Sequence, residues 1–461
     1  MNFWQLSASE IAQGIKAGQM SAQEVLKAHL RRLEEVNPKI NAVVQQTSSI
    51  AMEQAEKIDK KVKNNEELGM LAGVPVTVKV NIDQKNYATT NGARVNQHNI
   101  AKEDSPIVKN FINADAIIIG RTNAPAFSLR WFTNNEFHGR TLNPHNSLIT
   151  PGGSSGGASA AVAAGICPIA HGTDIAGSIR YPAYACGIHG IRPSFGKVPT
   201  YNATTGDRYI GGQLMAVSGP LARTVDDLRI ALNVLSKGDL RDPWYISEPK
   251  FDEDFERTVA VSPFPNDMTT DANIVNHIRS SAAILEKQGW KVEEVECPSF
   301  SKLADINLKL WMAETTSMNE VIYEERDPHA IFVYEHMKKK CGTLKLTDIM
   351  ECIKKRSEEI RVWTLFLKKY SLLICPISSS LPFHDQFDVK NEEAFDEVLN
   401  AQLTQLGLPV LGFPGLSLAT GIENSIPLGI QLISNRFRED IIFKAGAAIE
   451  RELYMPQVAT I

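Results

Sequence analysis

The sequence lacks three features that would point to particular classes of protein. It has no basic excess: 48 Lys and Arg stand against 53 Asp and Glu, a formal net charge of −5. No nucleic-acid or membrane-surface partner is therefore indicated. It also has no uninterrupted run of 18 apolar residues and no basic N-terminal region before an apolar segment, which argues against a membrane span or a secretory signal. We expect a soluble, cytoplasmic protein.

Cysteine is scarce and shows no pattern. There is no C-x-x-C pair and no zinc-ligand spacing, so we expect reduced, mostly buried thiols and no metal site. The six cysteines are Cys167, Cys186, Cys297, Cys341, Cys352 and Cys375. The sequence also lacks internal repeats and any composition typical of a linker. We therefore expect one domain spanning residues 1–461.

The residues that are present indicate a globular α/β protein. Hydrophobic residues make up 43% and charged residues 22%, which excludes a disordered or low-complexity chain. Ser7-x-x-Glu10 and Ser21-x-x-Glu24 are capping-box patterns and predict helices near the N-terminus, over about 7–66. A charged stretch at about 300–370 is helical in pattern and is interpreted as a helical layer or as an insert. Short apolar runs predict strands at about 41–45, 74–80, 116–119, 258–262, 290–295 and 371–376.

Residues 147–200 differ from both flanks because Gly, Ser, Ala and Pro crowd them. Glycines beside a serine allow backbone N–H groups to approach a ligand closely. No lysine follows these glycines, which excludes a P-loop, and no strand precedes them, which excludes a dinucleotide fingerprint. Residues 152–156, GGSSG, fit the nucleophile pattern G-x-S-x-G, but Thr150 and Pro151 are a poor end for the buried strand that such an elbow needs.

Two motifs carry a family resemblance. GGSSGG at 152–157 followed by GTDIAGSIRYPA at 172–183 resembles the signature of the amidase signature family of serine hydrolases. LAGVPVTVKVNID at 71–83 is similar to the family's lysine-bearing strand, and SGPLARTVDDL at 218–228 to a later segment. The resemblance implies a mixed sheet between helical layers, with a catalytic core at about 67–240.

The resemblance also implies roles for individual residues. Ser178 would be the nucleophile, Ser154 a bridging serine on a cis peptide, and Lys79 the base. The oxyanion hole would consist of backbone N–H groups of the turn that contains the nucleophile, and other residues would shape the site. These are Ile175, Ala176, Gly177 and Ser178 for the hole, Tyr181 for the substrate pocket, and Gly153, Ser155, Asp174 and Arg180 as structural neighbours.

The chemistry of this set depends on the lysine. A serine hydroxyl must pass its proton to a base during attack, and lysine is a base only when uncharged. Burial in the apolar VPVTVKV strand would depress the pKa of Lys79 from its ordinary value near 10.4. The expected reaction forms an acyl-enzyme, needs no metal or cofactor, and has a neutral-to-alkaline pH optimum.

Some residues invite other assignments. His171 and Asp174 lie near Ser178 and suggest a Ser-His-Asp triad, but we interpret both as structural. Among the two adjacent serines, only the family resemblance selects Ser154 over Ser155.

The chain also departs from the family pattern at several positions. Val80, Arg121 and Ala126 replace residues that are frequent in the family, and Ala176 stands where glycine is typical. If Ala176 had a positive φ, it would be strained by about 1 kcal/mol.

Three functions follow in order of preference. The first is a free-standing amidase that converts a carboxamide to a carboxylate and ammonia or an amine. The alternative is the glutaminase-type A subunit of an aminoacyl-tRNA amidotransferase, in which the residue at position 181 is usually Gln; here it is Tyr181. The second alternative is an inactive binding protein of the same fold. The expected partner is a small-molecule amide, and a homodimer is compatible with the sequence.

Overall fold

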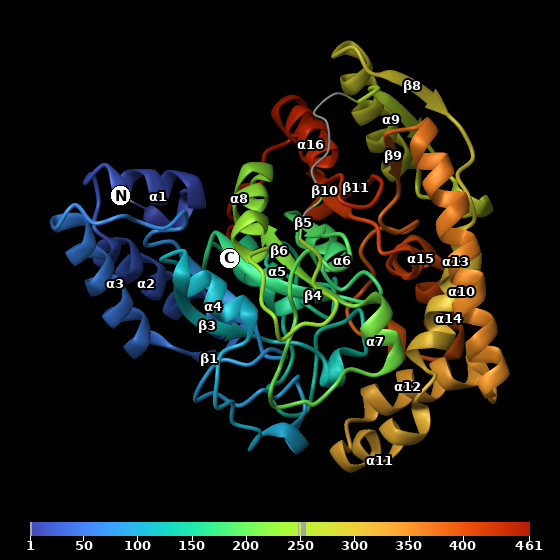
Figure 1. The fold of residues 1–461 in the computed structure, drawn as a ribbon, viewed down its shortest axis with the longest axis horizontal. Coiled ribbons are helices and arrows are strands. Elements are labelled where there is room, and N and C mark those ends of the chain that lie inside the picture. Colours follow the sequence, from blue (N-terminus) through green and yellow to red (C-terminus); the bar gives the residue numbers. More distant parts are fainter. Residues whose placement is uncertain (1, 248, 250–254) are drawn as a thin grey trace.

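The computed structural model describes residues 2–247, 249 and 255–461. Within them, an eleven-stranded sheet runs through the molecule in the order β1-β3-β2-β4-β6-β5-β10-β11-β9-β7-β8 (Figure 1). The sheet is mixed, because β2 pairs in parallel with β3 and β4, whereas β4, β6, β5, β10 and β11 pair antiparallel in succession. The strands are β1 Val43–Gln46, β2 Pro75–Lys79, β3 Ile117–Thr122, β4 Ile169–Asp174, β5 His189–Arg192, β6 Val217–Ala222, β7 Thr258–Val261, β8 Lys291–Glu294, β9 Leu372–Cys375, β10 Gly415–Glu423 and β11 Ile426–Ile433.

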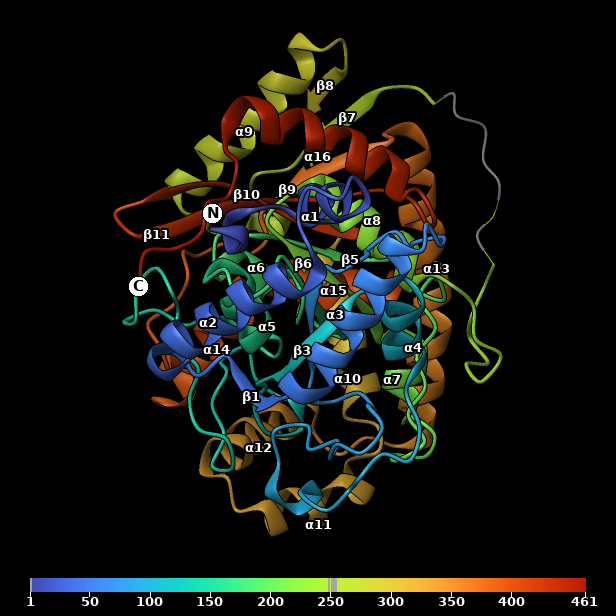
Figure 2. The ribbon, with the colours of Figure 1, turned by 90° about the vertical axis from the view of Figure 1, so that its left-hand side faces the viewer.

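Helices cover the sheet on both sides (Figures 1 and 2). On one side α16 packs against α8, α9 and β10, while α5 and α6 pack against the central strands. The helices are α1 Ala8–Lys16, α2 Ala22–Ile40, α3 Ser48–Lys63, α4 Pro106–Asn113, α5 Gly156–Ala163, α6 Arg180–Ala185, α7 Ile210–Met215, α8 Val225–Leu235, α9 Ala272–Lys287, α10 Phe300–Trp311, α11 Thr315–Glu325, α12 Pro328–Cys341, α13 Leu346–Lys369, α14 Glu392–Ala401, α15 Leu403–Leu411 and α16 Glu439–Leu453. Short 3-10 helices lie at Phe3–Gln5, Arg94–Asn96, Ala126–Ser128, Pro265–Asp267 and Phe387–Val389.

The elements predicted from sequence patterns are present. All six predicted strands are found, as β1, β2, β3, β7, β8 and β9, and the α/β fold class is confirmed. Both capping boxes form: the Ser7 and Ser21 hydroxyls accept bonds from the N–H groups of Glu10 and Glu24, whose carboxylates accept bonds in return. These side chains satisfy N–H groups that the first helical turn leaves free.

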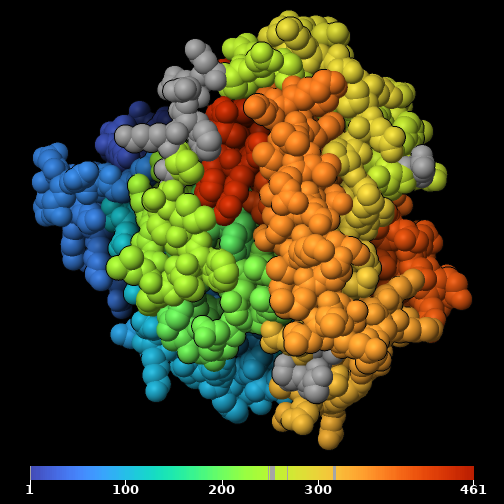
Figure 3. All heavy atoms as spheres, turned by 45° about the vertical axis from the view of Figure 1, so that its right-hand side comes forward, coloured from blue at the N-terminus to red at the C-terminus, as the bar shows by residue number. Residues whose placement is uncertain are grey.

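The segment at about 300–370 forms the four helices α10 to α13, as its pattern predicts. α10 packs closely against α15 and α13, and its Phe300 and Leu303 are fully buried. α13 lies along the surface of the molecule, where Figure 3 shows it in orange. α10 is therefore a packed layer of the fold, and α13 is its outer cover.

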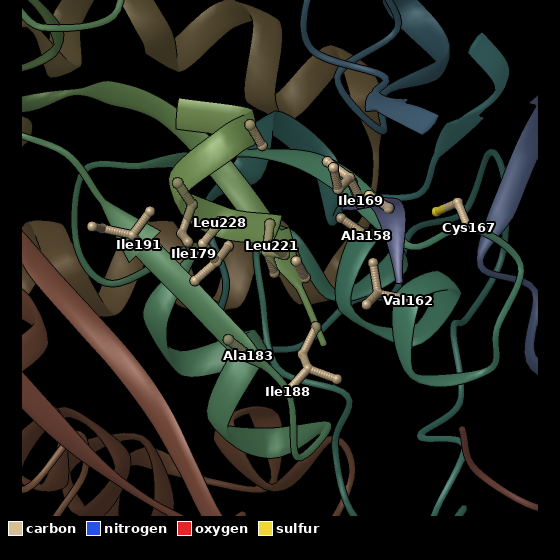
Figure 4. Close-up of a cluster of buried hydrophobic side chains, with 14 of the residues drawn as sticks. Ala158, Val162, Cys167, Ile169, Ile179, Ala183, Ile188, Ile191, Leu221 and Leu228 are labelled. Atoms are coloured by element: carbon tan, nitrogen blue, oxygen red, sulfur yellow. The ribbon is translucent and has the colours of Figure 1, made fainter. Parts of the chain in front are cut away.

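The core beneath the central strands is apolar. Ile169 of β4, Leu221 of β6 and Ile191 of β5 meet Ile179 in one buried cluster (Figure 4). Ile179 directly follows Ser178, so this cluster anchors the turn that carries the serine. All six cysteines are free, and five of them are buried, as expected. None of the described helices is long and apolar enough to cross a membrane.

Candidate active site

Lys79 ends strand β2 in the interior of the sheet. β2 lies between β3 and β4, and all five of its residues are buried. The Lys79 amine donates hydrogen bonds to the hydroxyls of Ser154 at 2.7 Å, Ser155 at 3.1 Å and Thr173 at 3.1 Å. Three hydroxyls therefore surround the buried amine.

The surroundings of Lys79 change its acid–base properties. Burial lowers its pKa to about 7, and the Asp174 carboxylate opposes part of that shift. Desolvation disfavours the charged ammonium, which is why the pKa falls. The amine is therefore largely neutral just above pH 7 and can accept a proton from a hydroxyl. This is the depression that the apolar VPVTVKV context predicts.

The glycine-rich turn before α5 brings Ser154 and Ser155 to Lys79. The Gly153–Ser154 peptide bond is cis, and a Cβ on Gly153 would collide with the backbone of the preceding loop. The two serines differ in their other contacts. Ser154 lines the adjacent pocket, whereas the Ser155 hydroxyl accepts a bond from the Thr173 N–H at 3.3 Å. The geometry thus gives Ser154 the position between lysine and pocket, a choice that the bare sequence leaves open.

Ser178 lies in the turn between β4 and α6 and also lines the pocket. Asp174, the last residue of β4, accepts hydrogen bonds from the N–H groups of Gly177 at 2.9 Å and Ile179 at 3.3 Å. Gly177 has a φ of +90°, and a Cβ there would collide with a side chain of α15. The left-handed conformation falls on Gly177 and not on Ala176, so the strain considered for Ala176 does not arise.

Two buried arginines hold Asp174 in place. Arg180 donates to both carboxylate oxygens at 3.0 Å, and Arg192 donates to the Asp174 carbonyl at 2.7 Å. Burial alone would raise the pKa of Asp174, but the two guanidinium groups hold it at about 2. Asp174 and Arg180 therefore join β4, the Ser178 turn and α6 through buried hydrogen bonds.

Two side chains from distant elements tether the carbonyl groups of the same turn. Trp131 Nε1 donates to the Ala176 carbonyl at 2.7 Å, and Asn307 Nδ2 of α10 donates to the Ile175 carbonyl at 2.9 Å. Neither residue was predicted from the sequence. No motif marks them, because their contacts exist only in the folded chain.

His171 lies on β4, and its ring is fully buried. Its Nδ1 accepts a bond from the Lys79 backbone N–H at 3.5 Å. Burial first, and then the nearby Lys79 and Arg121 charges, lower the pKa of His171 to about 3. The ring supports the backbone of the strand that carries Lys79, which agrees with its interpretation as a structural residue.

A pocket of about 350 Å³ opens above Ser154 and Ser178. One wall is apolar and contains Phe127, Tyr209 and Trp311, which belong to one hydrophobic cluster. Polar side chains of the 200–208 loop line another part, and Ile107 and Trp244 add further apolar surface. The cavity therefore combines a wall suited to an aromatic group with a hydroxyl-rich floor.

Tyr181 does not line this pocket. It lies on α6 with no exposed surface, in the main hydrophobic core, and burial raises the pKa of its phenol. Tyr181 therefore belongs to the hydrophobic core and not to the substrate pocket in which the family resemblance places it.

Thr173 and Asn81 are further polar residues of the site, and neither was predicted from the sequence. Asn81 Nδ2 donates to Thr173 Oγ1 at 2.9 Å, and the same oxygen accepts from Lys79. Both residues line the pocket. Their positions in the sequence could have indicated them, because Asn81 lies two residues after Lys79 and Thr173 lies within the GTDIAGSIR motif.

The residues that depart from the family pattern are all buried. Val80 and Ala126 are packed inside the protein. The buried Arg121 guanidinium donates to the Ile82 carbonyl at 2.9 Å, and burial lowers its pKa to about 10. None of these three positions supplies a partner of the Lys79 amine, which contacts Ser154, Ser155 and Thr173.

Comparison with known proteins agrees with this geometry. The sequence model of the Amidase family matches residues 24–443. An indoleacetamide hydrolase of Bradyrhizobium diazoefficiens is 40% identical over 97% of this chain and 86% of its own length. The A subunit of the glutamyl-tRNA(Gln) amidotransferase of Carboxydothermus hydrogenoformans is 31% identical over 98% of both chains.

Solved structures show the same fold. A bacterial aryl acylamidase of the amidase signature family superposes with a TM-score of 0.85 at 27% identity, covering 97% of this chain and 96% of its own. The A subunit of the Thermotoga maritima amidotransferase superposes with a TM-score of 0.81 at 22% identity, covering 100% and 99%. The mixed sheet, the buried lysine beside the serine-bearing turns and these relatives lead to one conclusion: the chain belongs to the amidase signature family and is an amidase.

Proposed function

We propose that this amidase hydrolyses the carboxamide of an aromatic acid, with Ser178 as nucleophile, Ser154 as proton bridge and Lys79 as base. One observation carries the proposal. The buried Lys79 amine, with a pKa of about 7, contacts the Ser154 hydroxyl at 2.7 Å on the floor of the pocket that Ser178 lines. A lysine in this state is neutral enough to act as a base at physiological pH.

The proposed reaction has two steps. Ser178 Oγ attacks the amide carbon while its proton passes to Ser154, whose own proton passes to Lys79. The C–N bond then breaks, and the relay returns a proton to the departing nitrogen, which leaves an acyl group on Ser178. Water repeats the sequence in the second step and releases the acid. No step uses a metal or cofactor.

Backbone N–H groups of the Ser178 turn stabilise the oxyanion in this proposal. The Gly177 N–H already donates to Asp174, so we assign the role to the N–H groups of Ile175, Ala176 and Ser178. Preorganised donors of this kind stabilise developing negative charge at no cost of reorientation. The Asp174 carboxylate and the tethers on the turn's carbonyls keep them in place.

The substrate class follows from the pocket and from the relatives. Phe127, Tyr209 and Trp311 form an apolar wall beside the serines, and aromatic walls of this kind bind planar rings well. Indoleacetamide hydrolases share up to 40% identity with the chain. We therefore propose arylacetamides, with indole-3-acetamide as the first compound to test.

The alternatives have less support. The amidotransferase A subunits are less similar in sequence than the indoleacetamide hydrolases, and an aromatic wall suits glutamine poorly. The inactive binding protein is set aside because the chain belongs to an amidase family with all three proposed catalytic side chains present. We propose a free-standing cytoplasmic enzyme, which six free cysteines also favour.

The test is release of ammonia by the purified chain from indole-3-acetamide, aliphatic amides, asparagine and glutamine. We expect turnover of the arylacetamide without a partner, no turnover by Ser178→Ala, and covalent labelling of Ser178 by a fluorophosphonate. Circular dichroism and thermal unfolding would establish that Ser178→Ala is folded.

Two results would contradict the proposal. Hydrolysis by folded Ser178→Ala would overturn the assignment of the nucleophile. Activity on glutamine alone would instead favour the amidotransferase alternative.

A further inference from the structure

Two buried polar atoms on the floor of the pocket lack hydrogen-bond partners. Within the described residues, neither Asn81 Oδ1 nor Ser218 Oγ contacts a donor or acceptor, although both residues line the pocket. Ser218 has no exposed surface. Buried polar groups are almost always satisfied in folded proteins, so two unsatisfied ones on residues that line a cavity point to a ligand that supplies the missing bonds.

Both residues lie on the Lys79 side of the pocket. Asn81 Nδ2 donates to Thr173 Oγ1 at 2.9 Å, and Thr173 Oγ1 also accepts from the Lys79 amine at 3.1 Å. Ser218 of β6 stands directly opposite Thr173 in the antiparallel β4–β6 ladder. Residues paired in this way project from the same face of a sheet with their side chains in contact distance. Asn81, Thr173 and Ser218 therefore form a polar cluster beside the base.

We propose that Asn81 Oδ1 and Ser218 Oγ form the leaving-group subsite, which holds the nitrogen of the scissile amide as it departs. The inference rests on the proposed role of Ser178. In acylation, the bond between the carbonyl carbon and Ser178 Oγ forms and the C–N bond breaks. The nitrogen keeps the bonding pair, receives one proton from the Lys79–Ser154 relay and leaves as ammonia.

The chemistry of the two atoms matches this ligand. The nitrogen of a primary amide carries two N–H donors in the tetrahedral intermediate and three as ammonia. Asn81 Oδ1 can only accept a bond and has no partner, and the amide orientation is fixed because Nδ2 donates to Thr173 Oγ1. The Ser218 hydroxyl accepts a second bond. Proton return also requires the nitrogen to lie beside Ser154, on the side of the pocket where these two atoms are found.

An ester distinguishes the subsite from a general structural role. A methyl ester of the same acid acylates Ser178 through the same base and the same oxyanion donors, but its leaving oxygen has no N–H to donate. Loss of the subsite should therefore slow the amide and spare the ester. Because esters are intrinsically more reactive than amides, we expect an enzyme that is acylated by the amide to be acylated by the ester as well.

The experiment compares kcat/KM for indole-3-acetamide and methyl indole-3-acetate in the wild type, Ser218→Ala and Asn81→Ala. We expect the amide-to-ester ratio to fall about tenfold in each variant, the effect of one lost buried hydrogen bond. The ratio does not depend on the fraction of active enzyme. Ser218→Ala is the cleaner variant, because its hydroxyl has no other contact to lose.

Ser417→Ala is the matched control. Ser417 of β10 is likewise fully buried, with an unpartnered hydroxyl in the same sheet. It does not line the pocket, so the amide-to-ester ratio of Ser417→Ala should equal that of the wild type. An unchanged ratio in Ser218→Ala and Asn81→Ala would overturn the subsite while leaving the proposed function intact. A wild type that hydrolyses neither compound would overturn both.

Discussion

At the scale of single residues, the site depends on how far the fold desolvates Lys79. Burial lowers its pKa to about 7, while Asp174 limits the shift, and the arginines around Asp174 in turn keep that carboxylate ionised. A lysine with a depressed pKa loses its charge as the pH rises through that pKa, and its neutral form is the one that accepts a proton. One chain of buried charges thus sets the pH at which the proposed relay becomes active.

The first prediction concerns the pH dependence of acylation. Below pH 7 the neutral fraction of Lys79 rises about tenfold per pH unit, and above pH 7 it saturates. The value of kcat/KM for an arylacetamide should therefore rise along an acid limb with an apparent pKa of about 7 and then level off. The measurement is a profile from about pH 5 to about pH 9.

Lys79→Ala provides the control for that profile. It should lower kcat/KM by about 100-fold or more near neutral pH, the usual contribution of a positioned base, and remove the limb. A variant that retains the same limb would show that another group titrates.

At the scale of secondary-structure elements, the sequence predicts the flanks of the sheet better than its centre. The apolar runs of β2 and β3 are strong strand signals. β4, with the sequence IAHGTD, and β6, with VSGPLA, were not predicted. Their Gly, Pro and Asp have low strand propensity, and neighbouring strands stabilise them in the fold. β5, β10 and β11 were missed as well.

In the site, too, local motifs predict some residues, whereas others depend on strand pairing. Lys79, Ser154 and Ser178 could be selected from sequence because contiguous motifs surround them. Thr173 and Ser218 meet only through the β4–β6 ladder, a pairing that no local pattern encodes. The family resemblance places Tyr181 in the substrate pocket, but the first turn of α6 directs it into the core.

The second prediction concerns α5, the helix behind Ser154 and Ser155. All eight of its residues are buried, and a Cβ on Gly157 would lie 2.7 Å from backbone oxygens of Ala42 and Asn123. Backbone atoms at this distance cannot move aside easily. Gly157→Ala should therefore lower the free energy of unfolding by about 1–3 kcal/mol, which urea denaturation would measure.

Gly212→Ala is the comparison variant for α5. Gly212 also lies in a helix, α7, but the nearest atom to its added Cβ is 3.4 Å away. Alanine should be neutral there or stabilise the protein by about 0.5–1 kcal/mol. Equal effects of the two substitutions would show that close packing of α5 is not the cause.

At the scale of the whole molecule, segments far apart in sequence are tied together. The buried Asp227 carboxylate of α8 accepts bonds from the N–H groups of Ala8 and Ser9 at 2.8 and 3.0 Å, at the start of α1. At the other end, the Ala459 N–H donates to the Ala163 carbonyl of α5 at 2.8 Å. These ties and the continuous sheet support our proposal that residues 1–461 form one domain.

The helices at 300–370 are part of this connectivity, although the sequence there resembles nothing diagnostic. Asn307 of α10 is fully buried and donates to the Ile175 carbonyl at 2.9 Å and to the Leu406 carbonyl at 2.7 Å. It joins the turn before Ser178 to α15. Trp311, one helical turn further on, lines the pocket. The segment thus contributes both a tether and a wall to the site.

The third prediction tests that tether. Asn307→Ala removes both hydrogen bonds, so the Ile175 carbonyl loses its fixed orientation and the N–H groups of the turn become less well aligned. We expect kcat/KM to fall about tenfold or more, since misplaced oxyanion donors are costly, together with a loss of about 1–3 kcal/mol in unfolding free energy.

Asn110→Ala is the matched control, because Asn110 of α4 also donates to two carbonyls, at 3.1 and 2.8 Å, on a segment remote from the Ser178 turn. It should show a similar loss of stability with kcat/KM unchanged. Equal losses of kcat/KM in the two variants would mean that α10 stabilises the fold without positioning the turn.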